Sequence, residues 1–133
     1  MNCVFCKIKN GELPSHKIYE DDNFLAFLDV NPINPGHLLL IPKKHVDYVF
    51  DLQEPLYSEM FKVAKKISKN LKKVMKAKRI GIAVEGFAVP HVHIHLVPIN
   101  HENELDPHRA KEATPEELYK VAKKILLKSP SSN

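Results

Sequence analysis

The feature that most constrains this fold is an alternation of histidine and aliphatic residues at 90–98, which reads Pro-His-Val-His-Ile-His-Leu-Val-Pro. Successive side chains of a β-strand point to opposite faces of a sheet. The alternation therefore predicts a strand over 91–98, with Val92, Ile94 and Leu96 in the core and the histidines on a polar face. Three histidines in five positions far exceed what chance placement gives, so this polar face is predicted to carry chemistry.

Four more segments have the pattern of β-strands. Residues 17–20 alternate in polarity, and a turn at 21–23 connects them to a second strand over 24–30, which predicts a hairpin. Residues 37–42 are mostly aliphatic, so this strand is expected to be buried on both faces. A fourth strand is predicted over 79–85. With the histidine strand they make a sheet of five mostly antiparallel strands.

Helical patterns occur in three places. Between 55 and 77, apolar residues recur at spacings of three and four, with lysines on the opposite side. The Thr-Pro-Glu-Glu sequence at 114–117 is a capping box that begins a short C-terminal helix. Residues 7–14 end in turn signals and predict a short helix or turn. The fold class is α+β, with one long helix packed on the sheet.

The length and composition predict a single domain. The chain has 133 residues, of which 44% are hydrophobic, and we expect the domain to span 1–128 with a disordered tail at 129–133. The longest apolar run, 38–41, is far shorter than the roughly 18 residues that a membrane span needs. No apolar stretch follows the first residues, so we expect no signal peptide and a cytoplasmic location.

The positive charge is concentrated in the predicted long helix. The net charge is +4, and every charged residue from Lys62 to Arg79 is basic. Such a face could attract phosphates, but no aromatic residues interleave with the lysines as a base-stacking platform requires. The solvated side of an amphipathic helix is the favoured interpretation, and a nucleic-acid partner is not expected.

The two cysteines, Cys3 and Cys6, form a C-x-x-C pair with three interpretations. A thioredoxin-like redox pair should follow a strand, and no strand precedes this one. Half of a zinc site would need two more ligands, and the eight histidines of the chain could supply them. The third interpretation is a pair of free thiols.

The histidines of 91–95 do not suit a single metal ion. On a straight strand, His91 and His95 would lie about 13 Å apart, at ~3.3 Å per residue. That separation is too long for ligands that bind at ~2.0–2.1 Å. A row of imidazoles is better suited to an extended anionic substrate, with the middle histidine, His93, acting as a nucleophile or base.

These residues resemble a known family. The pattern of 91–97 is similar to the signature of the histidine triad (HIT) family, and the resemblance extends in family order over residues 3–98. The further segments that carry it are Cys-Val-Phe-Cys-Lys-Ile at 3–8, Gly-Glu-Leu-Pro at 11–14, Tyr-Glu-Asp-Asp at 19–22, Leu-Ala-Phe-Leu-Asp-Val-Asn-Pro at 25–32 and Pro-Gly-His-Leu-Leu-Leu-Ile-Pro-Lys-Lys-His at 35–45.

The resemblance implies a nucleotide-binding hydrolase or transferase. Family members act at the α-phosphate of nucleoside phosphoramidates or dinucleoside polyphosphates, without an organic cofactor. His93 would form a nucleotidyl-histidine intermediate, while His95 and His37 would line the phosphate site. Asp29 would bind the ribose, although it could equally be a turn residue. A purine base would lie among apolar residues that could equally belong to the core, namely Phe5, Ile8, Leu13, Phe27 and Val30.

The resemblance also implies a structural zinc site and a homodimer. Some members with this cysteine pair use two histidines with it, which would here be His45 and His91. Free thiols remain the alternative, and His101 and His108 are rival ligands in a polar loop. Two sheets would join side by side in the dimer, with the long helices of 55–77 packed across the interface.

The chain departs from the family pattern just before the histidines. Many members carry a glutamine and a hydroxyl residue there that contact phosphate, whereas this chain has Phe87 and Ala88. The tryptophan that some members have near the C-terminus is absent as well. Three functions therefore stay open: a nucleotidyl hydrolase or transferase, a nucleotide-binding regulator with little or no catalysis, and a zinc-stabilised adaptor.

Overall fold

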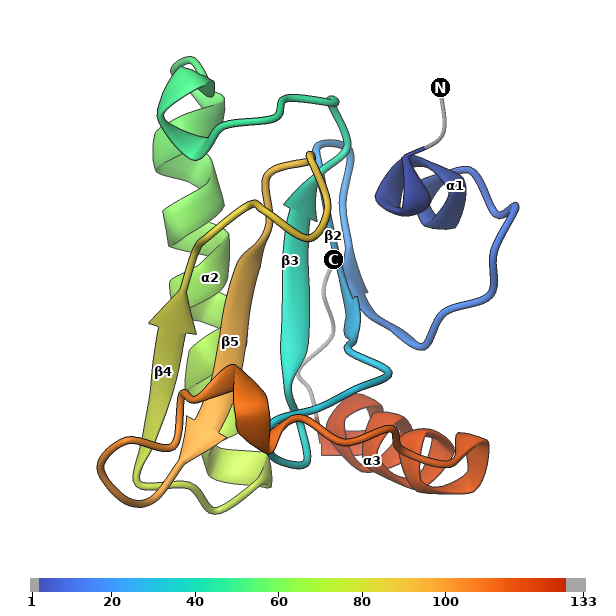
Figure 1. The fold of residues 1–133 in the computed structure, drawn as a ribbon, viewed down its shortest axis with the longest axis vertical. Helices are drawn as coiled ribbons and strands as arrows, with labels where there is room; N and C mark the ends of the chain where they lie inside the picture. Colours follow the sequence, from blue (N-terminus) through green and yellow to red (C-terminus); the bar gives the residue numbers. More distant parts are fainter. Residues whose placement is uncertain (1–2, 129–133) are drawn as a thin grey trace.

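A computed structural model describes residues 3–128 and shows a five-stranded sheet with helices on both faces (Figure 1). The strands lie in the order β1-β2-β3-β5-β4, and each neighbouring pair is antiparallel. The predicted α+β fold is confirmed, and the predicted tail at 129–133 lies outside the described residues. The strands are β1 (Lys17–Glu20), β2 (Phe24–Leu28), β3 (Leu38–Pro42), β4 (Arg79–Ala83) and β5 (Ile94–Ile99); the helices are α1 (Val4–Lys9), α2 (Leu56–Val74) and α3 (Pro115–Lys128), with 3-10 turns at Val49–Asp51 and Pro107–Arg109.

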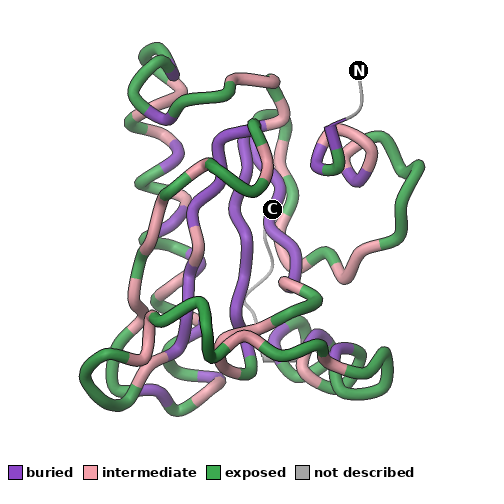
Figure 2. The backbone as a smooth tube through the Cα atoms, in the orientation of Figure 1, coloured by how far each residue is buried: buried purple, intermediate pink, exposed green. Residues whose placement is uncertain are grey.

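The sheet has a core on each face. The larger core lies between the sheet and helices α2 and α3, and it contains the inward side chains of β2, β3 and β5. The smaller core lies under α1, where Phe5 and Ile8 pack on Phe27, Leu39 and Ile41. Strands β2 and β3 are therefore buried along their whole length (Figure 2), which confirms the prediction for residues 37–42.

The two longer helices form for the reasons that the sequence predicts. Helix α2 buries one apolar stripe against the sheet and exposes its lysines. At the start of α3, the Thr114 N–H donates to the Glu117 carboxylate and the Glu117 N–H donates to the Thr114 hydroxyl, each at 3.1 Å. This pair of bonds is the predicted capping box.

Two predicted elements are misplaced. The histidine strand begins at Ile94 rather than at 91, because the His91 N–H donates to the Val89 carbonyl and the Val92 N–H donates to Val46 instead of to a strand neighbour. The first helix covers Val4–Lys9 rather than 7–14, because the Cys3 sulfur accepts the Cys6 N–H and caps the helix start.

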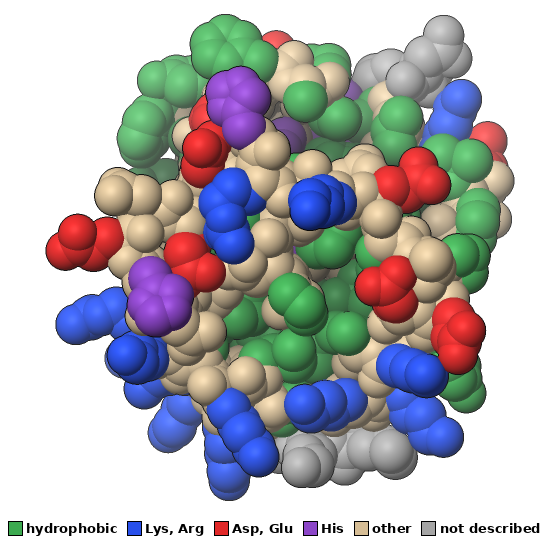
Figure 3. Space-filling view, turned by 60° about the horizontal axis from the view of Figure 1, so that its bottom comes forward, with side chains coloured by type: hydrophobic (Ala, Val, Ile, Leu, Met, Phe, Trp, Pro, Cys, Tyr) green, Lys and Arg blue, Asp and Glu red, His purple; other side chains and the backbone are tan. Residues whose placement is uncertain are grey.

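The face of the molecule drawn in Figure 3 carries both hydrophobic and charged side chains. Seen toward the lower end of Figure 1, hydrophobic side chains occupy the centre of the surface, and Lys and Arg side chains gather along its lower edge (Figure 3). No helix within residues 3–128 is long and apolar enough to cross a membrane.

Candidate functional site

One sheet face carries a pocket of about 290 Å³ over β4, β5 and the residue that precedes β3. The strand register places His95 of β5 between Leu39 of β3 and Ala83 of β4. Loops after β2 and β4 and the segment 105–110 form the walls. The residues that line it are Asp29, Asn31, Ile33, His37, Ala83, Glu85, Gly86, Phe87, Ala88, His93, His95, Val97, Leu105, Pro107 and Ala110.

His37 and His95 are joined by a hydrogen bond of 2.9 Å between His37 Nε2 and His95 Nδ1. The Ile33 N–H donates to His37 Nδ1 at 3.0 Å. In a neutral imidazole one nitrogen donates and the other accepts, so His37 carries its proton on Nε2 and donates it toward His95. His95 then carries its own proton on Nε2, where it can bind a phosphate oxygen.

His93 has the opposite tautomer. Its Nδ1 lies 2.7 Å from the His91 carbonyl, which can only accept, so Nδ1 carries the proton. The lone pair of Nε2 is therefore free to act as a nucleophile. The sequence predicts that His93 stands on an open polar face, and this prediction is wrong. The side chain is only 5% exposed, and the Phe5 ring packs edge-on against it with the two ring centroids 4.9 Å apart. Helix α1 covers this part of the sheet, which alternation alone cannot reveal.

Burial keeps the two bonded imidazoles neutral. It lowers the pKa of His37 to about 4, although the Asp29 carboxylate, 3.6 Å from His37 Nε2, acts in the opposite direction. Burial and the neighbouring His93 also lower the pKa of His95. Both residues are therefore hydrogen-bond donors without charge at neutral pH.

The low pKa of His37 predicts a loss of stability in acid. Between the ordinary histidine pKa of about 6.5 and the folded value of about 4, the unfolded chain binds more protons. The free energy of unfolding should fall as the pH falls through this window, by about 2–3 kcal/mol from His37. Urea unfolding of wild type and His37→Asn at pH 7.5 to 4.5 measures this contribution. Parallel pH curves for the two proteins would contradict it.

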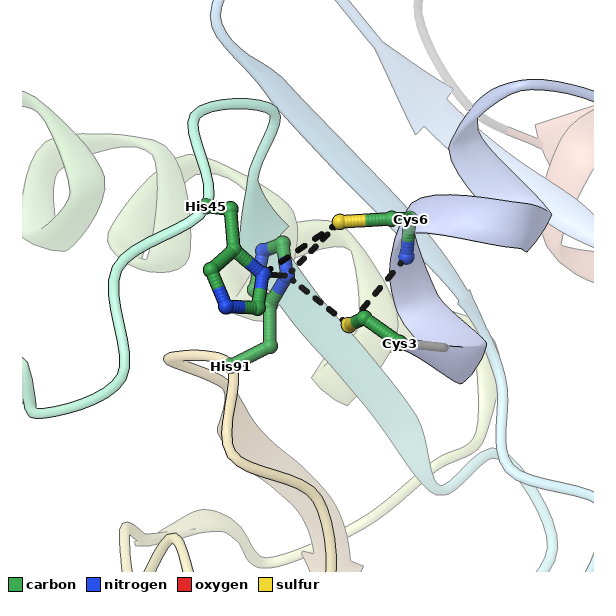
Figure 4. Close-up of side chains that lie close together, drawn as sticks. All are labelled: Cys3, Cys6, His45 and His91. Atoms are coloured by element: carbon green, nitrogen blue, oxygen red, sulfur yellow. Dashed lines mark hydrogen bonds between the residues drawn. The ribbon is translucent and has the colours of Figure 1, made fainter. Parts of the chain in front are cut away.

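A second cluster brings Cys3 and Cys6 to His45 and His91 (Figure 4). Cys6 Sγ lies 3.3 Å from His45 Nδ1 and 3.6 Å from His91 Nδ1, and Cys3 Sγ lies 3.4 Å from His91 Nδ1. The two Nδ1 atoms are 3.1 Å apart. All four donor atoms lie within 4.8 Å of one another, although they come from distant parts of the chain.

The donor set of this cluster fits zinc. Two sulfur and two imidazole ligands are a common structural zinc set. His91 Nε2 lies 2.8 Å from the Pro42 carbonyl, so it carries the proton and leaves the Nδ1 lone pair for the cluster. Burial also lowers the pKa of His91 and favours the neutral form that binds a metal. The rival ligands, His101 and His108, are not part of any such cluster among the described residues.

Comparison with known proteins now identifies the family. Residues 10–102 match the model of the HIT domain. The chain belongs to the HIT family. It is 43% identical over 104 residues to an uncharacterized HIT-like protein of Borreliella burgdorferi, covering 73% of this chain and 75% of that protein.

Two other HIT relatives carry informative names. The adenosine 5′-monophosphoramidase of Saccharomyces cerevisiae is 32% identical over 134 residues, covering 98% of this chain and 85% of that protein. A zinc-bound histidine triad family protein from Mycobacterium smegmatis has a similar solved structure, with a TM-score of 0.81 and 30% identity. That match covers 96% of this chain and 92% of the other.

Asp29 is both a turn residue and a pocket residue. Its Oδ1 accepts the Asn31 N–H at 2.8 Å, and its Oδ2 faces His37. The two interpretations that the sequence left open are therefore compatible. The ribose contact that the HIT resemblance implies stays a prediction.

The apolar residues assigned to the base fall into two groups. Phe5, Ile8 and Phe27 are buried in the small core under α1, whereas Leu13 and Val30 are 38% and 55% exposed. None of the five lines the pocket over the histidines. Their contact with a base stays a prediction, and the exposed pair is better placed to meet a ligand than the buried three.

Sequence reasoning missed the far wall of the pocket. Leu105, Pro107 and Ala110 come from a segment that appeared only polar and irregular, and Glu85 follows β4. The signal was weak: Leu105 is the single large apolar residue between Asn100 and Arg109. In the structure its side chain packs against Gly81, where a Cβ would lie only 2.9 Å from it.

Proposed function

We propose that this HIT protein hydrolyses or transfers a nucleotidyl group, with His93 as the nucleophile that attacks the α-phosphorus. The observation that carries the proposal is the hydrogen bond from His93 Nδ1 to the His91 carbonyl, which leaves Nε2 as the free nucleophile in the pocket. A histidine nucleophile splits one difficult displacement into two easier steps.

The proposed reaction has two displacements. In the first, a bond forms between His93 Nε2 and phosphorus, and the bond from phosphorus to the leaving group breaks. The leaving group keeps the electron pair and takes a proton from water. In the second, water attacks the phosphorus and gives up a proton, which neutralises the hydroxide left by the first step. The bond to Nε2 breaks with its electron pair on nitrogen, and a nucleoside monophosphate leaves. His95 Nε2–H stabilises the phosphate oxygens in both transition states, and His37 holds His95 in the required tautomer.

We further propose that Asp29 binds the ribose and that a purine base lies beside Val30 and Leu13. The name of the yeast relative, an adenosine 5′-monophosphoramidase, supports an adenine nucleotide and a phosphoramidate as substrate. The position of Asp29 in the pocket beside His37 also supports it.

A structural zinc ion at Cys3, Cys6, His45 and His91 is part of the same proposal. When bound, the ion would supply a crosslink and no reaction chemistry. His91 binds through Nδ1, and its backbone carbonyl orients His93, so the ligand set also fixes the nucleophile. The zinc-bound relative supports this assignment. Cytoplasmic conditions, which keep thiols reduced, suit such a site.

One observation favours a second candidate, a nucleotide-binding regulator. Phe87 and Ala88 border the pocket where many family members have a glutamine and a hydroxyl residue. Two side-chain donors to the phosphate are lost, so charge stabilisation depends more on the histidines. A regulator would bind nucleotides without turning them over.

Turnover separates the two candidates. The zinc-loaded protein is incubated with adenosine 5′-phosphoramidates and dinucleoside polyphosphates, and release of AMP is followed by chromatography. The hydrolase proposal expects AMP from at least one class. Tight AMP binding without release from any substrate would favour the regulator.

We also propose that the protein is a homodimer and that the edge strand β4 lies at the dimer interface. Strands β1 and β4 both end the sheet, and each packs with a helix, β1 with α3 and β4 with α2. Strand β4 still exposes half of Ile82. Edges of this kind are normally paired or covered. Ile82→Glu should convert a dimer to a monomer by light scattering at micromolar concentration. Leu126→Glu, at a similarly exposed apolar residue of α3, is the control that should stay dimeric. A monomeric wild type would contradict the proposal.

A further inference from the structure

The pocket extends to both sides of His93 and His95, toward Asp29 on one side and toward Glu85 on the other. Asp29 follows β2 and Glu85 follows β4, and the strand order β2-β3-β5-β4 places them on opposite sides of His93 and His95. Both acids line the same pocket. The proposed function places the ribose at Asp29, so the group that leaves from phosphorus lies toward Glu85.

The side toward Glu85 has no cationic side chain among its lining residues. Its wall consists of apolar residues, among them Phe87, Ala88, Leu105 and Pro107, and its charged member is the Glu85 carboxylate. Within the described chain, no lysine or arginine lines the pocket. A polyphosphate leaving group carries several negative charges, and a carboxylate beside an apolar wall repels them.

The cation that follows this wall in the sequence is already engaged. The Arg109 guanidinium donates to the Glu104 carbonyl at 2.8 Å and to Asn34 Oδ1 at 3.0 Å, and it lies 3.7 Å from the Glu104 carboxylate. These contacts tie two loops together. They leave Arg109 as a structural residue rather than a phosphate ligand.

We propose that this wall makes the enzyme selective for a cationic leaving group with an apolar body, which departs as an amine from a phosphorus–nitrogen bond. The inference rests on the proposed function and specifies its leaving group. Glu85 is the specificity-determining residue: its carboxylate attracts a positive charge on the amine, while the apolar wall contacts the carbon chain.

The carboxylate of Glu85 acts on the pKa of His95. Burial and His93 lower the pKa of His95, and the Asp29 and Glu85 carboxylates act in the opposite direction. Glu85 also lines the same pocket as His93 and His95, so its carboxylate faces the space where the proposed leaving group lies. The nitrogen that leaves phosphorus keeps the electron pair of the broken bond and takes one proton from water, which gives the neutral amine. The free amine then takes a second proton from solvent and becomes an ammonium cation next to this carboxylate.

A matched substrate series tests the proposal. AMP is linked through nitrogen to pentylamine, to 1,5-diaminopentane or to 5-aminopentanoate, so that the far end of one chain length is neutral, positive or negative. Diadenosine triphosphate is the polyanionic comparison. The values of kcat/KM are measured at low ionic strength, where charge effects are least screened, for wild type, Glu85→Gln and Glu85→Lys. Glu116→Gln, at an exposed acid on α3, is the control.

The wild type should cleave the diaminopentane substrate about fivefold faster than the aminopentanoate substrate, which corresponds to one partly exposed charge pair. Diadenosine triphosphate should be slower still. Glu85→Gln should abolish the charge preference, Glu85→Lys should reverse it, and Glu116→Gln should retain it. Cleavage of the three phosphoramidates at equal rates, or a preference that survives Glu85→Gln, would overturn this inference and leave the proposed function standing. An absence of turnover on every substrate would overturn both.

Discussion

Replacing His93 with alanine should lower kcat for nucleotide release by about 10⁴-fold or more, because loss of a covalent nucleophile removes the reaction path itself. The Nε2 lone pair of His93 is held toward the pocket by the bond from Nδ1 to the His91 carbonyl. No other described imidazole of the pocket shares that tautomer, since His37 and His95 present protonated Nε2 atoms. Single-turnover assays with an adenosine 5′-phosphoramidate measure the loss.

Burial of His93 requires a second variant. Because the side chain packs against Phe5, His93→Ala leaves a cavity and should also lower the melting temperature. His93→Gln keeps a polar side chain of similar size in contact with Phe5 and should lose turnover equally. His101→Ala, at an exposed histidine outside the pocket, should keep wild-type activity.

The covalent intermediate gives a direct measurement. Rapid acid-free quenching of wild type followed by mass spectrometry should find an added nucleotidyl mass on the peptide that contains His93. Neither His93 variant should show it. Turnover within tenfold of wild type in His93→Gln would contradict a nucleophilic role for this residue.

The sequence predicts the fold correctly where the apolar positions of a segment are also the positions that the core buries. Alternation placed Ile94 and Leu96 in the core, and the aliphatic run of 37–42 predicted a strand buried on both faces. The start of the histidine strand was mispredicted, because the carbonyls of Val89 and Val46 accept the N–H groups of His91 and Val92. The first of these bonds is a local turn and the second joins distant segments, and neither leaves a trace in the side-chain pattern.

The candidate site also has features that the sequence predicts and features that depend on the fold. Residue type and spacing singled out the histidines and cysteines, since few other side chains can do their chemistry. The tautomers of His93 and His95 could not be predicted, because they depend on a carbonyl and on a neighbouring ring. Glu85 and Leu105 were missed for another reason: their role depends on which strands are neighbours in the sheet.

Removal of the proposed zinc ion should lower the melting temperature by about 10 °C or more, since loss of about 3 kcal/mol shifts the midpoint of a domain this size by that amount. The ligands join α1 to the β3–α2 connection and to the residues before β5, so the ion crosslinks three separate segments. Without it, the small core under α1 depends on a six-residue helix that has little stability of its own.

Metal analysis and melting curves measure this effect in protein purified without a histidine tag. Wild type should contain about one zinc per chain, and both a chelator and Cys3→Ser should give the low melting temperature. His16→Gln, at a histidine outside the cluster, is the control. Activity should also fall, since His91 holds His93 through its carbonyl, but by less than in His93→Gln. Protein with under half an equivalent of zinc, whose melting temperature does not rise when zinc is added, would show that Cys3 and Cys6 are free thiols.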